Sequence, residues 1–335
     1  MNKILLRSYK QPIGLIAGGL LVLLFAIGNL KYGVTHFNGY DLLSAFFHTD
    51  LSLVSHITLI EVRLPMVLMA IIAGASLAIS GLLLQRVTQN PLACPSLSGV
   101  EYGTACCVIL CYMFIPHVSK LGIMCISLMG GLFTYLLTQA IVKKIGATTT
   151  GITLIGIAFD ALYFSLIQAI LLAFPYQAQS ILYDLNGSLQ GITFNDIGLV
   201  ALPFVVLFIV VLLLGKRLDL LNLDELQASA LGVSIKPYRL IMLAVSIILA
   251  TLVTSLIGPL LFFSLVVPHL VRSLTSSRYI ILFCAIYGAA LLLMAQLLTY
   301  LVSPLTPPPV GLVMLLIAAP MLTIIIRRHL PYDER

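Results

Sequence analysis

Long apolar segments separated by short polar ones set the pattern of this chain. An α-helix needs about 20 residues to cross the hydrocarbon core of a bilayer, and runs of that order recur from end to end. The apolar residues are continuous and do not alternate with polar ones, which favours helices over the strands of a membrane barrel. The predicted spans are residues 12–30, 64–84, 99–116, 121–142, 151–174, 195–214, 238–256, 258–272, 279–301 and 309–326.

Composition supports a membrane protein. Of 335 residues, 60% are hydrophobic and 9% are charged, and the mean hydropathy is +1.11. Soluble domains carry about 25% charged residues, so a water-soluble fold could not cover its surface with so few. We therefore expect an all-α polytopic membrane protein of about ten helices, folded as a single transmembrane domain over residues 1–335.

The distribution of Lys and Arg predicts the orientation. With a cytoplasmic N-terminus, 15 of the 18 basic residues fall in cytoplasmic segments, and only Lys31, Arg63 and Lys120 lie outside. Cytoplasmic loops of membrane proteins are enriched in these residues. An even number of spans then places both termini in the cytoplasm. The net charge of +6 is explained by this topology, and no nucleic-acid partner is needed.

The first span resembles a signal peptide, because Lys3, Arg7 and Lys10 precede an apolar stretch. Removing it would leave an odd number of spans and would spoil the charge distribution. We therefore expect the first span to be retained.

Two prolines interrupt the chain between the second and third spans, where residues 89–103 read QNPLACPSLSGVEYG. A residue before proline is disfavoured in a helix and stays extended, and proline itself cannot donate a backbone hydrogen bond. We expect a rigid elbow that positions helices and carries no chemistry. Its residues are Asn90, Pro91, Leu92, Ala93 and Pro95.

The longest predicted cytoplasmic segment is residues 215–239, GKRLDLLNLDELQASALGVSIKPYR. Asn222 or Asp224 could cap a short helix, and Gly232 fits the position just past a helix end. The apolar residues of this helix have no core of their own to enter. A docking site for a cytoplasmic partner is therefore favoured over the alternative, a packed loop.

Four motifs in order resemble the permease subunits of ABC importers for iron–siderophores, haem and cobalamin. Residues 63–103, with RLP, GASLAISG, NPLA and a following proline, are similar to the family's first signature. The other three motifs are LNLDELQASALGV at 221–233, GPLLFFSLVVPHLVR at 258–272, and PPPVGLVMLLIAAPMLTIIIRR at 307–328.

The resemblance implies the ten-helix architecture of type II ABC importer permeases in the bacterial cytoplasmic membrane. It also implies a second permease subunit (identical or paralogous), two copies of a cytoplasmic ATPase, an extracellular or periplasmic substrate-binding protein, and membrane lipid as partners, with no cofactor. In this reading segment 215–239 couples to the ATPase. The matching residues are Leu223, Glu225, Ala228, Leu231 and Gly232.

External arginines of the family pair with carboxylates on the binding protein. Met66 stands where the family usually has a second arginine, so Arg63 becomes the main candidate for docking.

No catalytic set is recognisable, so we expect a transport subunit and not an enzyme. Gly215–Lys216 lacks the upstream glycine that a P-loop requires, which places ATP hydrolysis on another chain. The six cysteines have no CxxC pairing, and we interpret them as packing residues. His269 is interpreted as a structural contact, and no metal site is expected.

Asp160 lies in the middle of the fifth span, where an ionisable residue is costly and suggests function. Gly156 and Phe164 lie one turn away. Because the resemblance implies that the fifth helix lines the translocation path, Asp160 and Phe164 would face it. The alternative is a buried carboxyl, protonated or hydrogen-bonded within the bundle. Glu101 raises the same question with less force.

A secondary transporter or channel is the rival reading. It would be favoured by ion-coupling charges in several spans and by an inverted repeat. Only Asp160 is a strong candidate for such a charge.

Overall fold

The computed structural model describes residues 2–33, 37–47, 53–115, 117–146, 149–175, 185–215, 235–275 and 279–329. Every regular element in these residues is a helix. The long apolar helices are α1 (Asn2–Lys31), α4 (Leu64–Val87), α6 (Lys120–Ile145), α7 (Thr149–Ala173), α9 (Phe194–Leu214), α11 (Lys236–Ile257) and α13 (Ile280–Val302). Apolar stretches shorter than a full span occur in α5 (Val100–Phe114), α12 (Phe263–Leu274) and α14 (Val310–His329). Each predicted span corresponds to one of these helices.

The second span begins earlier than predicted. Helix α3 (Val54–Ile57) and the π-helix η1 (Thr58–Arg63) continue into α4, so one helical rod runs from Val54 to Val87 over 34 residues. The wider turn is shown by the hydrogen bond from the Leu64 amide to the Leu59 carbonyl, five residues earlier. Pro65 follows directly and has no N–H for the usual ladder, which favours such a local widening. A further short helix, α2 (Gly39–Phe47), precedes the rod.

The eighth span is shorter than predicted. It was expected over 258–272, but α12 begins only at Phe263. Residues 258–262 are not helical, and both Gly258 (φ 78°) and Phe262 (φ 61°) adopt the left-handed half of backbone space. Pro259 lies between them, so this stretch reverses direction before the helix starts.

Helix α4 is the central helix of the bundle, with 83% of its best apolar window buried against 11% for α1. Small residues allow its neighbours to approach closely. A Cβ on Gly74 would overlap the backbone at Gly288 in α13, and one on Gly81 would overlap the Ser264 carbonyl of α12. On the α11 side, the Ser80 and Ser246 hydroxyls each donate to the other residue's carbonyl, at 2.6 and 2.7 Å.

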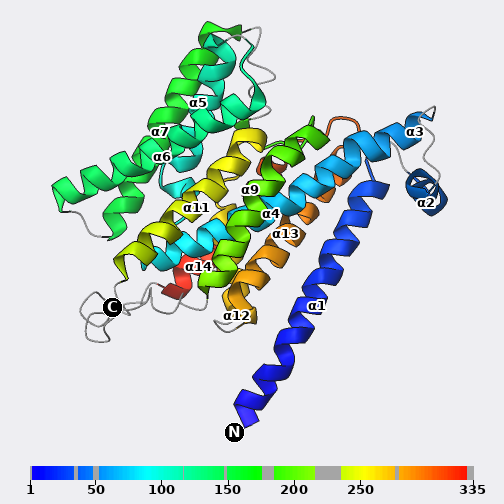
Figure 1. The fold of residues 1–335 in the computed structure, drawn as a ribbon, viewed down its shortest axis with the longest axis horizontal. Coiled ribbons are helices and arrows are strands. Elements are labelled where there is room, and N and C mark those ends of the chain that lie inside the picture. The colour runs from blue at the N-terminus through cyan, green and yellow to red at the C-terminus, as the bar shows by residue number, and fades with distance from the viewer. Residues whose placement is uncertain are drawn as a thin grey trace.

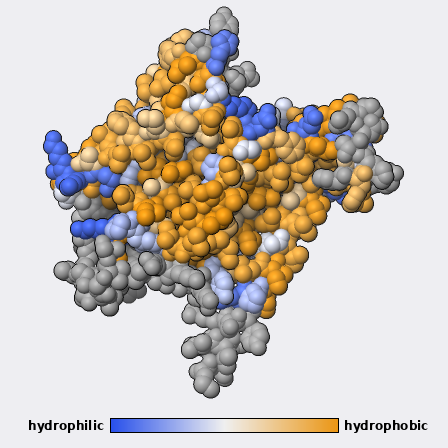
Figure 2. All heavy atoms as spheres, in the orientation of Figure 1, coloured by the Kyte–Doolittle hydropathy of each residue, from blue (hydrophilic) through white to orange (hydrophobic). Residues whose placement is uncertain are grey.

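Helices α5, α6 and α7 form a group that packs on α11, while α1 lies at the opposite edge against α13 (Figure 1). The η2 turn (Pro95–Leu97), between α4 and α5, contacts α4, α5, α7 and α11. Hydrophobic residues cover the centre of the visible face, and hydrophilic residues gather toward its edges (Figure 2). This pattern is the surface expected of a bundle surrounded by lipid.

Candidate functional site

The elbow between α4 and α5 is built as its prolines predict. Cys94, which precedes Pro95, is extended at φ −154° and ψ 157°. Asn90 closes the first half of the turn, because its side-chain oxygen accepts from the Leu92 amide at 3.0 Å and its carbonyl accepts from the Ala93 amide at 3.1 Å. Pro91 lies at the exposed edge of the turn. The predicted elbow residues therefore form one compact turn.

Beyond Pro95 the elbow enters a buried polar network centred on Glu101. The Ser96 hydroxyl donates to Glu101 Oε1 at 3.0 Å and lies 3.2 Å from the Ser264 hydroxyl. The Leu260 amide donates to Glu101 Oε2 at 3.1 Å. Glu101, Ser96, Ser264 and Leu260 are all 0% exposed. The elbow, the start of α5 and the approach to α12 thus meet at one carboxylate.

Helix α7 closes over the other side of the elbow. Gly156 lies so near the Leu97 carbonyl that a Cβ at this position would overlap it. Gly99 ends the elbow at φ 80°, in the left-handed region that glycine adopts most easily. The elbow residues and α7 are therefore packed backbone to backbone, with no side chain between them at Gly156.

Asp160 lies one turn after Gly156 and is half-buried on the same side of α7. Its carboxyl lies near the Gly99 backbone and Glu101. Its Oδ1 is buried without a hydrogen-bond partner among the described residues. Asp160 thus lies on the elbow side of α7 in this structure.

Phe164 has a different environment from Asp160. It is 46% exposed and makes an edge-to-face contact with Tyr102 of α5, with 5.9 Å between the ring centres. The structure therefore brings both predicted path residues to the boundary between α5 and α7, but only Phe164 is substantially open.

Arg63 is buried within the chain, with 4% of its surface exposed. Its Nη1 donates to the Leu30 carbonyl at 2.7 Å, and its guanidinium lies 4.5 Å from the centre of the Phe37 ring. These contacts join η1 to the end of α1 and the segment that follows it. One turn later, the Met66 sulfur accepts hydrogen bonds from the Gln296 side-chain amide and the Tyr300 hydroxyl, each at 3.3 Å.

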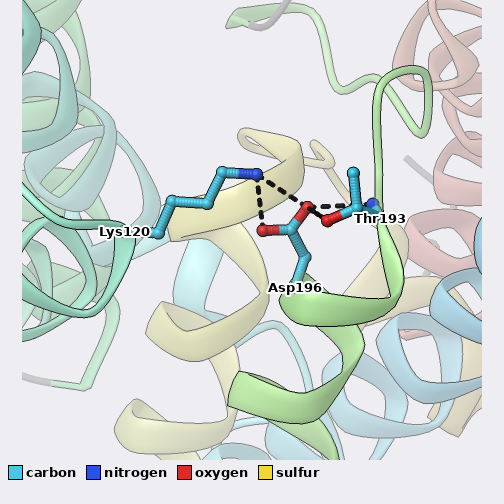
Figure 3. Close-up of polar contacts among 3 residues, drawn as sticks. All are labelled: Lys120, Thr193 and Asp196. Carbon is cyan, nitrogen blue, oxygen red and sulfur yellow. Dashed lines mark hydrogen bonds and ion pairs between the residues drawn. The ribbon is translucent and has the colours of Figure 1, made fainter.

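An ion pair at the starts of α6 and α9 was missed by the sequence analysis. Lys120 Nζ lies 2.6 and 2.8 Å from the two Asp196 carboxylate oxygens (Figure 3). Asp196 is 1% exposed and also accepts from the Thr193 amide and hydroxyl, at 2.9 and 2.8 Å. The sequence does carry a signal, since Thr193 followed by Asp196 is a capping-box spacing, but nothing in it pairs them with Lys120.

At the far end of α12, Arg272 Nη2 donates to Gln85 Oε1 of α4 at 2.7 Å. His269 Nδ1 lies 3.1 Å from the Leu265 carbonyl one turn earlier. The described residues hold no group of three or more His, Cys, Asp or Glu that could bind a metal ion. The predicted coupling residues Leu223, Glu225, Ala228, Leu231 and Gly232 lie outside the described residues.

Comparison with known proteins gives a consistent result. The profile of the FecCD transport family matches residues 20–328. "Probable heme-iron transport system permease protein IsdF" of Staphylococcus aureus strain MSSA476 is 32% identical over 311 residues, covering 92% of this chain and 94% of the relative. The protein of the same name from strain Newman matches at the same identity and coverage, 32% over 92% and 94%.

Solved structures share the architecture. A structure described as an inward-facing conformation of a metal-chelate type ABC transporter has a TM-score of 0.78 and 26% identity, covering 95% of this chain and 99% of that chain. PsaBC from Streptococcus pneumoniae in complex with Fab has a TM-score of 0.57 and 19% identity, covering 78% and 90%. The second likeness concerns the fold alone.

Proposed function

Because the chain belongs to the FecCD transport family, we propose that it is the permease subunit of an ATP-driven importer that carries an iron complex into a bacterial cell. The observation that carries this proposal is the 32% identity to a heme-iron transport permease across 92% of the chain. The cargo is haem or a ferric siderophore, with a cobalamin-like macrocycle as the third class. The apolar helices hold the subunit in the cytoplasmic membrane, with both termini in the cytoplasm.

The permease works in a complex. It pairs with a second permease subunit, identical or paralogous, and each pair engages two ATPase chains in the cytoplasm and a substrate-binding protein outside. Support for separate ATPase chains comes from the sequence, which has no P-loop. Segment 215–239 is the docking site for the ATPase, through Leu223, Glu225, Ala228, Leu231 and Gly232.

The translocation path runs along α7. Only 17% of this helix's apolar window is buried within the chain, so most of its surface is available to a second subunit or to the cargo. Phe164 is exposed at this surface, and Asp160 lies at its edge against the elbow. The two residues would meet the cargo in succession as α7 shifts against the elbow.

The test is uptake by proteoliposomes that contain the permease with its ATPase and binding protein. Haem, a ferric siderophore and cobalamin, each labelled, are offered at equal concentration with ATP on the ATPase side. We expect accumulation of at least one of the two iron complexes and no accumulation without ATP. Accumulation of cobalamin alone would overturn the cargo assignment, and accumulation of none would overturn the proposed function.

A further inference from the structure

Glu101 is unusual for a carboxylate inside a membrane bundle. It is 0% exposed, and burial of a charged group is costly unless it is paired and hydrogen-bonded. Its partners are a hydroxyl and a backbone amide, not a Lys or Arg, in the part of the chain that the structure describes. A residue retained only for packing would be served better by an apolar side chain, so the contacts of Glu101 need another explanation.

The contacts link segments that are distant in sequence. Through Ser96, Glu101 holds the elbow, and through the Leu260 amide it holds the reversing stretch that leads into α12. Ser96 and Ser264 close the triangle at 3.2 Å. Glu101 lies in the first turn of α5, Ser96 in the η2 turn and Ser264 in the first turn of α12, and residues 258–262 before α12 are non-helical. These hydrogen bonds, together with the apolar packing of Cys94 and Leu97 against Leu265 and Val266, hold the elbow beside α12.

This placement of the elbow affects α7 directly. The far side of the elbow touches Gly156 through the Leu97 carbonyl, and Gly99 lies against Phe159 of α7. The Leu97 carbonyl leaves no room for a Cβ at Gly156, so the elbow and α7 are packed backbone to backbone there. The other end of α12 is tied to α4 through Arg272 and Gln85. Residues in contact with one another therefore connect α12, through Glu101 and the elbow, to α7.

We propose that Glu101 is a positioning residue for transport, which fixes the elbow against α12 and thereby makes α7 follow movements of α12. The inference rests on the proposed function, since it takes α7 to line the path. Glu101 does not touch cargo. It acts through the hydrogen bonds it accepts, and not through its charge.

Substitutions of Glu101 separate the effect of its hydrogen bonds from the effect of its charge. Glutamine can keep the whole network: its oxygen accepts from the Leu260 amide, and its NH₂ donates to Ser96, whose hydroxyl turns to donate to Ser264. Alanine removes both bonds. We therefore expect Glu101→Gln to behave as the wild type to within about threefold in uptake, whereas Glu101→Ala loses about tenfold or more, the scale set by leaving the buried Leu260 amide without its acceptor.

The experiment measures uptake and ATP hydrolysis in the same proteoliposomes of the full importer. We expect Glu101→Ala to raise the ATP hydrolysed per cargo moved about tenfold while hydrolysis itself changes less than about threefold, and Glu101→Gln to restore the ratio. Wild-type uptake in Glu101→Ala, or equal loss in the Gln and Ala variants, overturns the proposal.

Ser96→Ala is a milder variant for the case in which Glu101→Ala fails to fold. It removes one hydroxyl and leaves the hydrogen bond between Glu101 and the Leu260 amide in place. We expect it to raise the same ratio by about threefold or more, the scale of a single hydrogen bond. Ser127→Ala is the matched control, since Ser127 is 0% exposed and, among the described residues, bonds only to the Met124 carbonyl of its own helix. An effect of Ser127→Ala as large as that of Ser96→Ala overturns the proposal.

Hydrogen exchange gives a readout that needs no cargo. Glu101→Ala is expected to speed amide exchange about tenfold in peptides covering 94–99 and 258–264, with no change for Glu101→Gln. If the wild type moves none of the tested cargoes, the proposed function fails, but the exchange pattern still shows whether Glu101 holds residues 94–99 against residues 258–264. If exchange rises as expected but an active importer keeps its ATP-to-cargo ratio, the junction is structural and the positioning role is overturned.

Discussion

The guanidinium of Arg63 donates to the Leu30 carbonyl and covers the Phe37 ring, with 4% of the residue exposed. From sequence this residue stands out only as one of few external charges, and docking to a binding protein is the natural hypothesis. The buried side chain also stabilises the fold, because it joins three segments at one end of the bundle. Docking by Arg63 stays a prediction.

Replacing Arg63 by alanine should destabilise the protein by about 2–4 kcal/mol, from one cation–π contact and one hydrogen bond by a charged donor. Thermal unfolding in detergent measures this, with Lys143→Ala as the control, since Lys143 is exposed on α6. An Arg63→Glu variant that unfolds normally but binds the binding protein more weakly would instead support docking.

Asp160 and Phe164 differ in exposure, and this difference can be tested by thiol labelling. In a background without the six native cysteines, we expect Phe164→Cys to react with a hydrophilic reagent. Asp160→Cys should react at least about tenfold more slowly and only in a state where α7 has left the elbow, because water is excluded from a packed interior.

The control for labelling is Leu20→Cys on α1, where Leu20 is 61% exposed toward the surroundings of the bundle. A lipid-facing thiol should not react with a hydrophilic reagent. If the thiols at positions 160 and 164 are both as protected as that at position 20, with and without nucleotide, the path does not follow this side of α7.

At the level of elements, α4 depends on close contact between backbones. Gly81 lies against the Ser264 carbonyl of α12, at the same junction that holds Glu101. Gly81→Ala should destabilise the bundle by about 1–3 kcal/mol, the usual cost of overpacking. Gly19→Ala is the matched control, because a Cβ on Gly19 in α1 would meet nothing within 4 Å and should be neutral or stabilising by up to about 1 kcal/mol. Equal thermal shifts in the two variants would contradict the central role of this contact.

The coupling segment gives a second prediction at this level. Gly232→Val should strain the turn that the sequence predicts after a short helix, where positive φ is favoured, at about 1–2 kcal/mol. We expect normal insertion and expression but loss of ATP-driven uptake. Unchanged uptake in Gly232→Val would remove segment 215–239 from the coupling mechanism.

For the whole molecule, each predicted apolar segment corresponds to a long or short apolar helix among the described residues, because continuous hydrocarbon of that length is stable as helix in lipid. Proline chemistry likewise predicted the elbow, down to the extended Cys94. The helical extension before Leu64 was not predictable from apolar runs, since it contains Glu61 and Arg63 and its start is set by tertiary contacts.

Contacts between distant residues were the part that sequence could not supply. Lys120 and Asp196 are 76 positions apart, and Glu101 and Leu260 are 159 apart. Hydropathy places each residue in or near a span, but only packing decides which polar groups meet. The coupling residues of segment 215–239 lie outside the described part of the chain, so their role still rests on the sequence and on the family.

The claim that this permease imports its cargo at the expense of ATP is tested most directly by the source of energy for uptake. Labelled iron complex is added outside proteoliposomes that contain the complete importer. Its uptake is measured under three conditions: in the presence of ATP, in the presence of ATP and vanadate, and with an imposed proton or sodium gradient alone. We expect accumulation with ATP only, abolished by vanadate. Accumulation driven by the ion gradient and insensitive to vanadate would contradict the account and identify a secondary transporter.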